Sequence, residues 1–254
     1  MSGTRHVLIT GGTSGIGLAA AIGFAADPNT HVILSGRNAA RGAQACAAVK
    51  AAHPDATVDV IAADVATHAS AKHLLEQAAA RFSGAIDVLV NAAGGDSVPT
   101  LFHETGLDEI DAVIRTWLLA TLYCCRLALP VMADGGAIVN VASDAAKVPT
   151  PGESVIGAAM AGIAMFSRTL AMEAKRRRIR VNTVTPSLVS GTRTTERITA
   201  GGFSARLFEK AARAAHLGVP DPDDVASVIL FLAGPDAARM TGQVISVNGG
   251  ISAG

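Results

Sequence analysis

The residues best suited to chemistry form a glycine-rich run, TGGTSGIG, at positions 10–17. This run follows a short apolar segment expected to be a strand and opens an alanine-rich segment expected to be a helix. Its glycines permit a tight turn, close approach of the backbone to a phosphate, and close packing of helix on strand. The N–H groups at the helix start then face a pyrophosphate. The order of strand, glycines and helix predicts a dinucleotide site built from Gly11, Thr13, Ser14, Gly15, Ile16 and Gly17.

The end of the second expected strand carries Ser35, Arg37 and Asn38. A site for NAD normally places a carboxylate near this position, where it binds the ribose diol. Hydroxyl, amide and planar guanidinium groups suit a 2′-phosphate instead. These residues therefore predict NADP(H) rather than NAD(H), with an ordinary surface arginine as the alternative interpretation of Arg37.

Two later strand ends carry further candidates for the same site. Asp64 and Val65 end the third expected strand, where a carboxylate can accept a hydrogen bond from an adenine amino group. Asn91, Ala92 and Gly94 end the fourth, where small residues let the backbone pass close to a ligand. Aspartate and asparagine also cap helices, so each residue is modest support alone. Together they mark the carboxyl ends of successive strands, where open α/β sheets bind ligands.

The elements that must position these residues alternate along the chain. Short β-branched runs alternate with alanine-rich stretches, and most of these runs are apolar on both faces. Such strands are typical of a parallel sheet covered by helices on both sides. We therefore predict right-handed βαβ units in one doubly wound α/β sheet. The expected strands are Val7–Thr10, Val32–Ser35, Val58–Ala62, Val88–Asn91, Ala137–Val141, Arg180–Val184 and Val244–Val247.

Length and composition bound the remaining possibilities. The 254 residues, 50% hydrophobic, fit a single domain over 1–254. Lys plus Arg and Asp plus Glu both number 21, which gives no electrostatic case for nucleic acid or an anionic membrane as a partner. We expect neither a signal peptide nor a membrane span. Cys46, Cys124 and Cys125 form no metal-ligand or disulfide pattern, so we expect no metal and a cytoplasmic location.

One region breaks the alternation of strand and helix. Residues 187–218 are polar and irregular, with two glycines at 201 and 202. A connection this long usually carries helices of its own and often covers a pocket. Its surplus of basic residues would suit an anionic substrate, or would simply be a solvated lid face.

These motifs together resemble the short-chain dehydrogenase/reductase family, and the match covers essentially the whole chain. In family order they are the glycine run, Asp64–Val65, Asn91–Gly94, Ile138–Ser143, Arg180–Asn182 and Thr241–Gly250. The resemblance implies a seven-stranded Rossmann-type sheet, a nicotinamide cofactor, and a homo-oligomer, tetramer or dimer, with two long helices across an interface. It also implies that Pro186 and Thr192 lie at the cofactor. Ser187 replaces the glycine expected after Pro186, a change that would displace Thr192 from its cofactor-amide contact.

Catalysis in that family rests on asparagine, serine, tyrosine and lysine, and only the serine, Ser143, is carried over. The tyrosine position is Ile156, thirteen residues after Ser143, and the lysine position is Met160, four residues further. The asparagine position corresponds to Trp117. Neither isoleucine nor methionine can donate a proton or bond a ribose hydroxyl. Cofactor binding should survive on the glycine run and the helix dipole, in weakened form.

Three functions fit this pattern. The first is an NADP(H)-dependent oxidoreductase for a carbonyl or alcohol substrate, with proton delivery from solvent or a nearby acid. The second is a catalytically silent binding or assembly protein on the same fold, and the third is a non-redox enzyme. Residues that border the expected pocket and carry polar or titratable groups are Asp96, His103, Asp144, Lys147, Glu153 and Ser154. Ancestry favours oxidoreductase as the broad class, and activity itself stays open.

Overall fold

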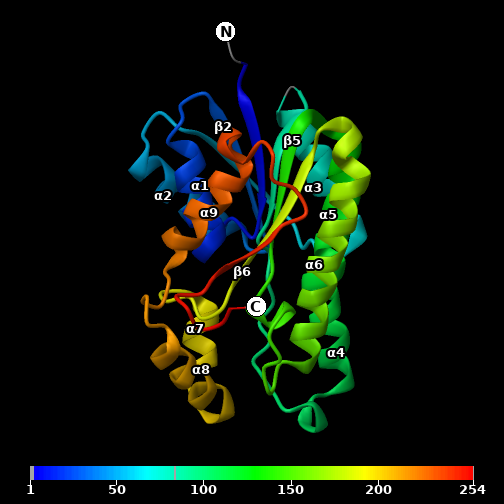
Figure 1. The fold of residues 1–254 in the computed structure, drawn as a ribbon. Helices are drawn as coiled ribbons and strands as arrows, with labels where there is room; N and C mark the ends of the chain where they lie inside the picture. Colours follow the sequence, from blue (N-terminus) through cyan, green and yellow to red (C-terminus); the bar gives the residue numbers. More distant parts are fainter. Residues whose placement is uncertain (1–2, 83, 254) are drawn as a thin grey trace.

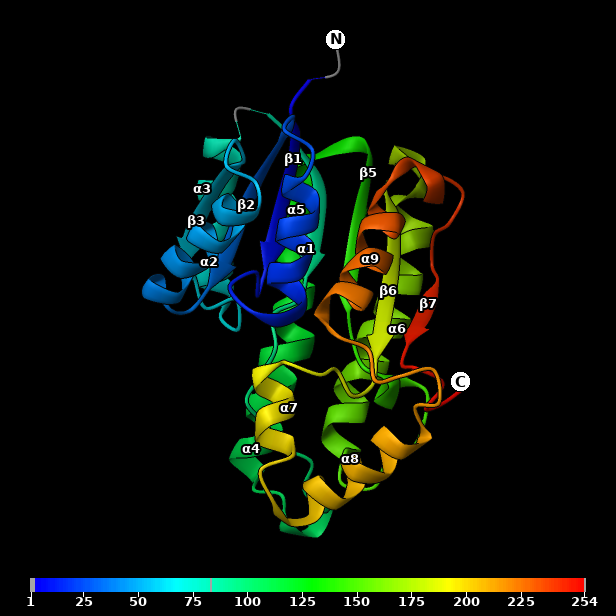
Figure 2. The same cartoon turned by 90° about the vertical axis from the view of Figure 1, so that its left-hand side faces the viewer.

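A computed structural model describes residues 3–82 and 84–253 of the chain. It forms a seven-stranded sheet in the order β3-β2-β1-β4-β5-β6-β7, with every pair of neighbours parallel. Helices cover both faces of the sheet (Figures 1 and 2). The predicted doubly wound fold is thus confirmed. The strands are β1 (Arg5–Thr10), β2 (Thr30–Gly36), β3 (Thr57–Ala62), β4 (Ile86–Asn91), β5 (Met132–Val141), β6 (Arg180–Pro186) and β7 (Val244–Val247).

Each predicted strand is present, and the largest difference lies at the start of β5. The sequence predicted a start at Ala137, whereas β5 begins at Met132, which pairs with Ile86 before the register shifts. The intervening residues are small or polar and include Gly135 at φ +86°, so they lack the β-branched pattern typical of a strand. Pairing with β4, rather than local preference, holds this part of the strand.

The core explains why the strands are apolar throughout. Alternate residues of β1 are fully buried on opposite faces, with Val7 and Ile9 on one side and Leu8 on the other. On the first face lie α1 (Gly15–Ala25), α2 (Ala39–Ala52) and α9 (Pro222–Ala233); on the second lie α3 (His68–Arg81), α5 (Ala120–Ala128) and α6 (Ser154–Ala174), as Figure 1 shows. Strand order reverses between β1 and β4, which opens a crevice at their carboxyl ends.

Two long helices run beside each other on the second face. The continuous helix Leu107–Val131 contains α4 (Leu107–Val113), a π-helical segment η2 (Ile114–Leu119) and α5, and it packs against α6. By length and composition, this helix and Ser154–Arg177 are both apolar enough to cross a membrane. Their inner faces join the core, while Met165 and Met172 on α6 are exposed.

The segment 187–218 contains α7 (Arg193–Ile198) and α8 (Gly202–Ala214), which lie beyond the carboxyl ends of the strands (Figure 2). Leu188, Ile198 and Phe208 are buried together in a small cluster of their own. Val98 and Ile251 pack against this cluster from the loop after β4 and from the C-terminal tail. The segment is therefore held to the domain by apolar contacts with two distant parts of the chain.

Candidate functional site

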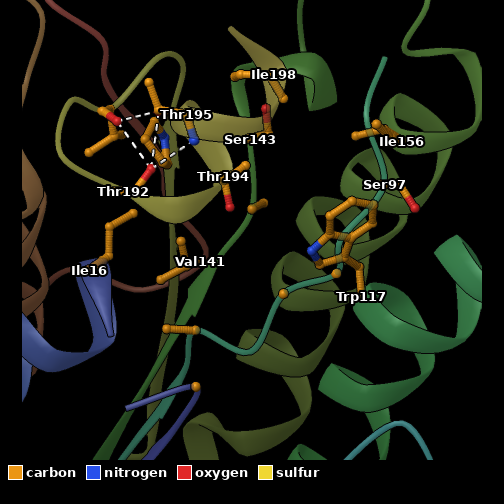
Figure 3. A pocket seen from close by; sticks show the side chains of 18 of the residues that line it. Ile16, Ser97, Trp117, Val141, Ser143, Ile156, Thr192, Thr194, Thr195 and Ile198 are labelled. Atoms are coloured by element: carbon orange, nitrogen blue, oxygen red, sulfur yellow. Dashed lines mark hydrogen bonds between the residues drawn. The ribbon is translucent and has the colours of Figure 1, made fainter. Parts of the chain in front are cut away.

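A cavity of about 600 Å³ lies at the carboxyl ends of the strands, where the strand order reverses. Its wall comes from the loops after β1 to β6, from α7 and α8, and from the C-terminal tail. Figure 3 shows part of this wall, with Ile16 at one end and Trp117 and Ile156 at the other. The volume is within the range of small-molecule and cofactor sites. The six residues of the predicted glycine run all line it.

The glycine run fits a bound phosphate. Helix α1 begins directly after Ser14, whose side chain makes no capping hydrogen bond, so the first-turn N–H groups keep room for an anion. A Cβ at Gly11, where φ is +68°, would lie 2.4 Å from the carbonyl oxygen of Ala92. A Cβ at Gly17 would lie 2.4 Å from the carbonyl oxygen of Gly11. Only glycine therefore permits this loop, and the cradle suits the pyrophosphate of a dinucleotide.

The residues after β2 divide into two groups. Ser35 and Arg37 line the cavity, although the Ser35 hydroxyl is buried and has no hydrogen-bond partner among the described residues. Asn38 does not line it, because its side chain accepts a hydrogen bond from the Arg41 N–H at 2.9 Å and caps α2. The Arg37 guanidinium is half-exposed and lies 3.2 Å from the carboxylate of Asp96. Arg37 is thus the predicted residue of this group that can offer a cation to a ligand, and Arg41 also lines the cavity nearby.

The next two strand ends are also divided. Asp64, Val65, Ala92 and Gly94 line the cavity. Asn91 does not, because its buried side chain donates to the Asn140 carboxamide oxygen at 2.9 Å and accepts from the Thr10 hydroxyl at 3.3 Å. Asn91 therefore ties the ends of three strands together beneath the cavity and presents no group to a ligand.

The four positions that the sequence assigns to the family tetrad meet at the far end of the cavity. Ser143, Ile156, Met160 and Trp117 all line it, and Figure 3 shows the first, second and last of these around the same opening. The Ser143 oxygen accepts a hydrogen bond from the Ala145 N–H at 3.3 Å, which leaves the hydroxyl proton to donate. Ile156 and Met160 are 9% and 4% exposed and belong to one apolar cluster. This end of the cavity is therefore walled by hydrocarbon.

Trp117 lies in the π-helical segment η2, a local geometry that is frequent at functional sites. Its indole nitrogen lies 3.1 Å from the place a Cβ would take at Gly94. The sequence suggested that Gly94 makes room for a ligand, and the structure shows that its missing side chain also makes room for the indole. This pairing was invisible in the sequence because the two residues belong to different elements.

Two acids near Ser143 have different surroundings. The buried Asp144 carboxylate accepts hydrogen bonds from Ser246, Asn248 and Ser252 and so fixes the C-terminal tail. Glu153 is half-buried, and burial raises the pKa of its carboxyl to about 7. A hydrogen bond with Thr150 acts against this rise in pKa, and the charge of Asp144 adds to it.

The other sequence candidates for proton transfer lie elsewhere. His103 is exposed beside Glu104, Ser154 is exposed at the start of α6, and Lys147 bonds Ser246, so none of the three lines the cavity. Asp96 does line it, and it pairs with both Arg37 and Arg197. The hydrogen bond from Arg197, first among these contacts, lowers the pKa of the Asp96 carboxyl.

The loop after β6 closes one side of the cavity. Pro186 and Thr192 line it, and the Thr192 oxygen caps α7 by accepting from the Thr195 N–H at 3.1 Å (Figure 3). Sequence reasoning missed several residues of this wall. Only Ile251 had a signal in the sequence, since it is a large apolar residue that follows two glycines in a tail of small and polar residues. The missed residues are Arg41, Ser97, Thr194, Thr195 and Ile251.

Sequence comparison identifies relatives over nearly the full length. The profile of a family described as enoyl-(acyl carrier protein) reductase matches residues 11–252. The 2,3-dihydroxy-2,3-dihydro-p-cumate dehydrogenase of Pseudomonas putida is 34% identical over 249 residues, which cover 96% of this chain and 92% of the relative. The 3-oxoacyl-(acyl-carrier-protein) reductase of Thermotoga maritima is 33% identical over 253 residues, which cover 96% of each chain.

Solved structures agree with this relationship. Levodione reductase superposes with a TM-score of 0.91 at 27% identity, over 98% of both chains. A short-chain dehydrogenase of Burkholderia cenocepacia, solved in complex with NADP, superposes with a TM-score of 0.88 at 29% identity, over 99% of both chains. The similarity therefore extends over every element that forms the cavity.

Proposed function

The chain belongs to the short-chain dehydrogenase/reductase family, and from this premise we propose that it binds NADP(H) and exchanges a hydride with a carbonyl or alcohol substrate beside Ser143. One observation carries the proposal: a single cavity joins the uncapped start of α1 to the Ser143 hydroxyl. When bound, the nicotinamide supplies or takes up the hydride. The similar structure from Burkholderia cenocepacia, which contains NADP, supports this choice of cofactor.

The phosphate end of the cavity would hold the cofactor mainly through the backbone. The first-turn N–H groups of α1 would bind the pyrophosphate, and the Asp64 carboxylate would accept from the adenine amino group. Arg37 would bind the 2′-phosphate. Its contact with Asp96 joins two well-exposed side chains, and such pairs contribute only about 0–1 kcal/mol. The guanidinium can therefore exchange that carboxylate for a phosphate at small cost.

The substrate end would position and shield the reacting group. The Ser143 hydroxyl would donate a hydrogen bond to the substrate oxygen, while Ile156, Met160 and Trp117 exclude water. None of these three side chains is an acid or a base strong enough to transfer a proton to the substrate at neutral pH. The proton of a carbonyl reduction must then come from another group or from solvent.

A second candidate is a protein that binds the dinucleotide without turning it over. The observation that favours it is the continuous apolar cluster formed by Ile156, Met160 and Trp117 with Val113 and Ala142. In either case we propose a cytoplasmic homo-oligomer, a dimer or tetramer, since Met165 and Met172 are exposed on one long helix. The mass of the protein in solution tests the assembly.

Deuterium transfer tests hydride exchange directly. The purified chain would be incubated with NADPH deuterated at the transferable position and with cyclic and aliphatic ketones, and products would be examined by mass spectrometry. The oxidoreductase proposal predicts an alcohol carrying one deuterium at the former carbonyl carbon. Saturable NADPH binding without deuterium in any product would leave the silent binding protein as the function.

A further inference from the structure

We propose that Glu153 is the proton donor that replaces the missing phenol, and that the substrate it serves is an uncharged carbonyl compound. This inference rests on the proposed function and adds a residue to it. Glu153 lines the same cavity as Ser143 and Ile156.

Position along α6 supports this role. Glu153 immediately precedes the helix and lies three residues before Ile156. Residues three apart are neighbours on one helix face, and side chains at a helix start lean toward its N-terminus. The Glu153 side chain makes no capping hydrogen bond to the helix. Its carboxyl group therefore remains available one turn before the position that holds the phenol in the family.

Asp64 lies at the adenine end of the cavity, and two further acids of the wall, Asp144 and Asp96, are already engaged, which favours Glu153. Asp144 accepts three hydrogen bonds from the C-terminal region, and Asp96 pairs with two arginines. Within residues 3–82 and 84–253, no lysine, arginine or histidine forms an ion pair with Glu153. Glu153 thus combines access to the cavity with a carboxyl group that forms no ion pair with a cation in the described part of the chain.

The surroundings keep this carboxyl partly protonated at neutral pH. Burial raises its pKa to about 7, the Thr150 hydrogen bond opposes that rise, and the Asp144 charge adds to it. An acid is most effective when its pKa lies near the working pH. Charged groups on the elements around this end are Asp96, Glu109, Asp144, Lys147, Arg193, Arg197 and Lys210. Of these, Asp144 is the one whose charge acts on Glu153.

Reduction of the carbonyl needs one hydride, which the cofactor supplies, and one proton, which Glu153 supplies. The carbonyl carbon accepts a hydride with its electron pair from the reduced nicotinamide, and a C–H bond forms. The carbonyl π pair moves to oxygen, which Ser143 steadies through a hydrogen bond. That oxygen takes the Glu153 proton, which yields the alcohol, the Glu153 carboxylate and oxidised cofactor. Water that reaches the cavity then restores the proton to Glu153.

The same surroundings define the substrate class. A cationic ligand would pair with the Glu153 carboxylate, stabilise its charged form and so remove the proton that reduction needs. A carboxylate on the part of the ligand that enters the reaction end would lose its hydration against the apolar wall of Ile156 and Met160. An uncharged ketone or aldehyde with an apolar body avoids both penalties.

Infrared titration tests the protonation of Glu153 without cofactor. The protonated carboxyl band should titrate near pH 7 in the wild type, vanish in Glu153→Gln, and persist in Glu173→Gln, which changes an exposed glutamate of the same helix. Stability gives a second readout. Because the folded pKa is raised from 4.5, the contribution of Glu153 to stability is complete below 4.5 and is lost as pH rises toward 7. The melting temperature of the wild type should therefore fall relative to Glu153→Gln over this interval.

Kinetics test the role of the proton. Ketone reduction should decline as pH rises through 7, and alcohol oxidation should decline as pH falls below 7. Glu153→Gln should lower both rates by roughly 10²–10⁴-fold with an unchanged NADPH dissociation constant, and Glu153→Asp should keep the pH dependence at a lower rate. Thr150→Val should move the profile to higher pH, because it removes the hydrogen bond that lowers the Glu153 pKa.

The outcomes separate the two proposals. An unchanged rate and pH profile in folded Glu153→Gln would overturn the role of Glu153, while the ketone reduction that remains would uphold the proposed function. Absence of NADPH binding would contradict the proposed function. The infrared and stability titrations would still show whether the Glu153 carboxyl is protonated near pH 7. Binding of piperidinium and of cyclohexanone tests the substrate class. Tighter binding of piperidinium, with a preference that grows as pH rises through 7, would overturn this class and show that Glu153 acts as a counter-ion.

Discussion

The two ends of the cavity differ in how they are built. The phosphate end depends on the backbone at Gly11 and Gly17 and on the uncapped start of α1. The reaction end depends on side chains, and there Ile156 and Met160 form an apolar wall at the two positions that the sequence assigns to the proton-handling pair of the family. A site made of backbone persists as long as the fold persists, whereas a site made of side chains can change by single substitutions. The cavity therefore combines an end built by the backbone with an end whose character is set by side chains.

The largest effect should come from making the reaction end resemble the family. Ile156→Tyr combined with Met160→Lys should raise ketone reduction by about 10²–10⁴-fold, because positioned acid–base catalysis contributes that much. Initial rates of NADPH oxidation measure the change. Met160→Lys alone is the control, since an ammonium buried without a partner should lower the melting temperature and give no gain in rate. A double variant that binds NADPH normally and shows no gain would mean that the altered end lacks more than an acid.

The next effect should come from breaking the phosphate end. Gly11→Ala forces a side chain into a left-handed conformation and against the Ala92 carbonyl, so the loop must shift. We expect a cost of about 1–3 kcal/mol, or about 5- to 150-fold weaker NADPH binding by titration. Gly106→Ala is the matched control, because no atom lies within 4 Å of the added Cβ. Equal NADPH affinity in the two variants would contradict the backbone-built site.

A smaller effect should appear in the choice of cofactor. Arg37→Gln should weaken NADPH binding by about tenfold, close to 1.4 kcal/mol, and leave NADH binding unchanged. Calorimetric titration with both nucleotides measures the difference. Arg206→Gln, which changes an exposed arginine outside the cavity, should alter neither value. A parallel loss for both nucleotides would assign Arg37 to a general role in the loop rather than to the 2′-phosphate.

The smallest effect should come from the contact that joins the two ends. Asp96 bonds Arg37 and Arg197, and the pKa of its carboxyl is lowered by them. A carboxyl with a lowered folded pKa stabilises the protein above its unfolded pKa and loses that contribution as pH falls. Asp96→Asn should therefore lower stability at neutral pH by less than about 1 kcal/mol, and the difference should shrink in acid. Denaturant unfolding at the two pH values measures it, and a larger loss in acid would contradict the pairing.

The fold could be predicted because short sequence patterns determine it. Strands that are apolar on both faces and a glycine run at a strand end specify a parallel sheet and its crevice. The roles of Asn38 and Asn91 were harder to predict, because a side chain that can bind a ligand can also cap a helix or join strands. Here Asn38 caps α2, and Asn91 joins neighbouring strands. The choice depends on neighbours that the sequence does not place.

The reaction end shows the same limit more sharply. Spacing located Ile156 and Met160, but it gave no reason to prefer Glu153 over His103 or Lys147 as a titratable group in the cavity. Burial of Glu153, the commitment of Asp144 to the C-terminal tail, and the exposure of His103 arise only when distant segments pack. The sequence therefore predicted which positions line this end, and only packing distinguishes among the titratable groups around them.

We expect the phosphate end to bind a dinucleotide although Ile156 and Met160 occupy the positions assigned to the proton-handling pair. Calorimetric titration of the unmodified chain with NADPH and with NADH tests it most directly. Both nucleotides should bind saturably, and NADPH should bind more tightly than NADH. Absence of saturable heat from a folded protein with either nucleotide at millimolar concentration would contradict it.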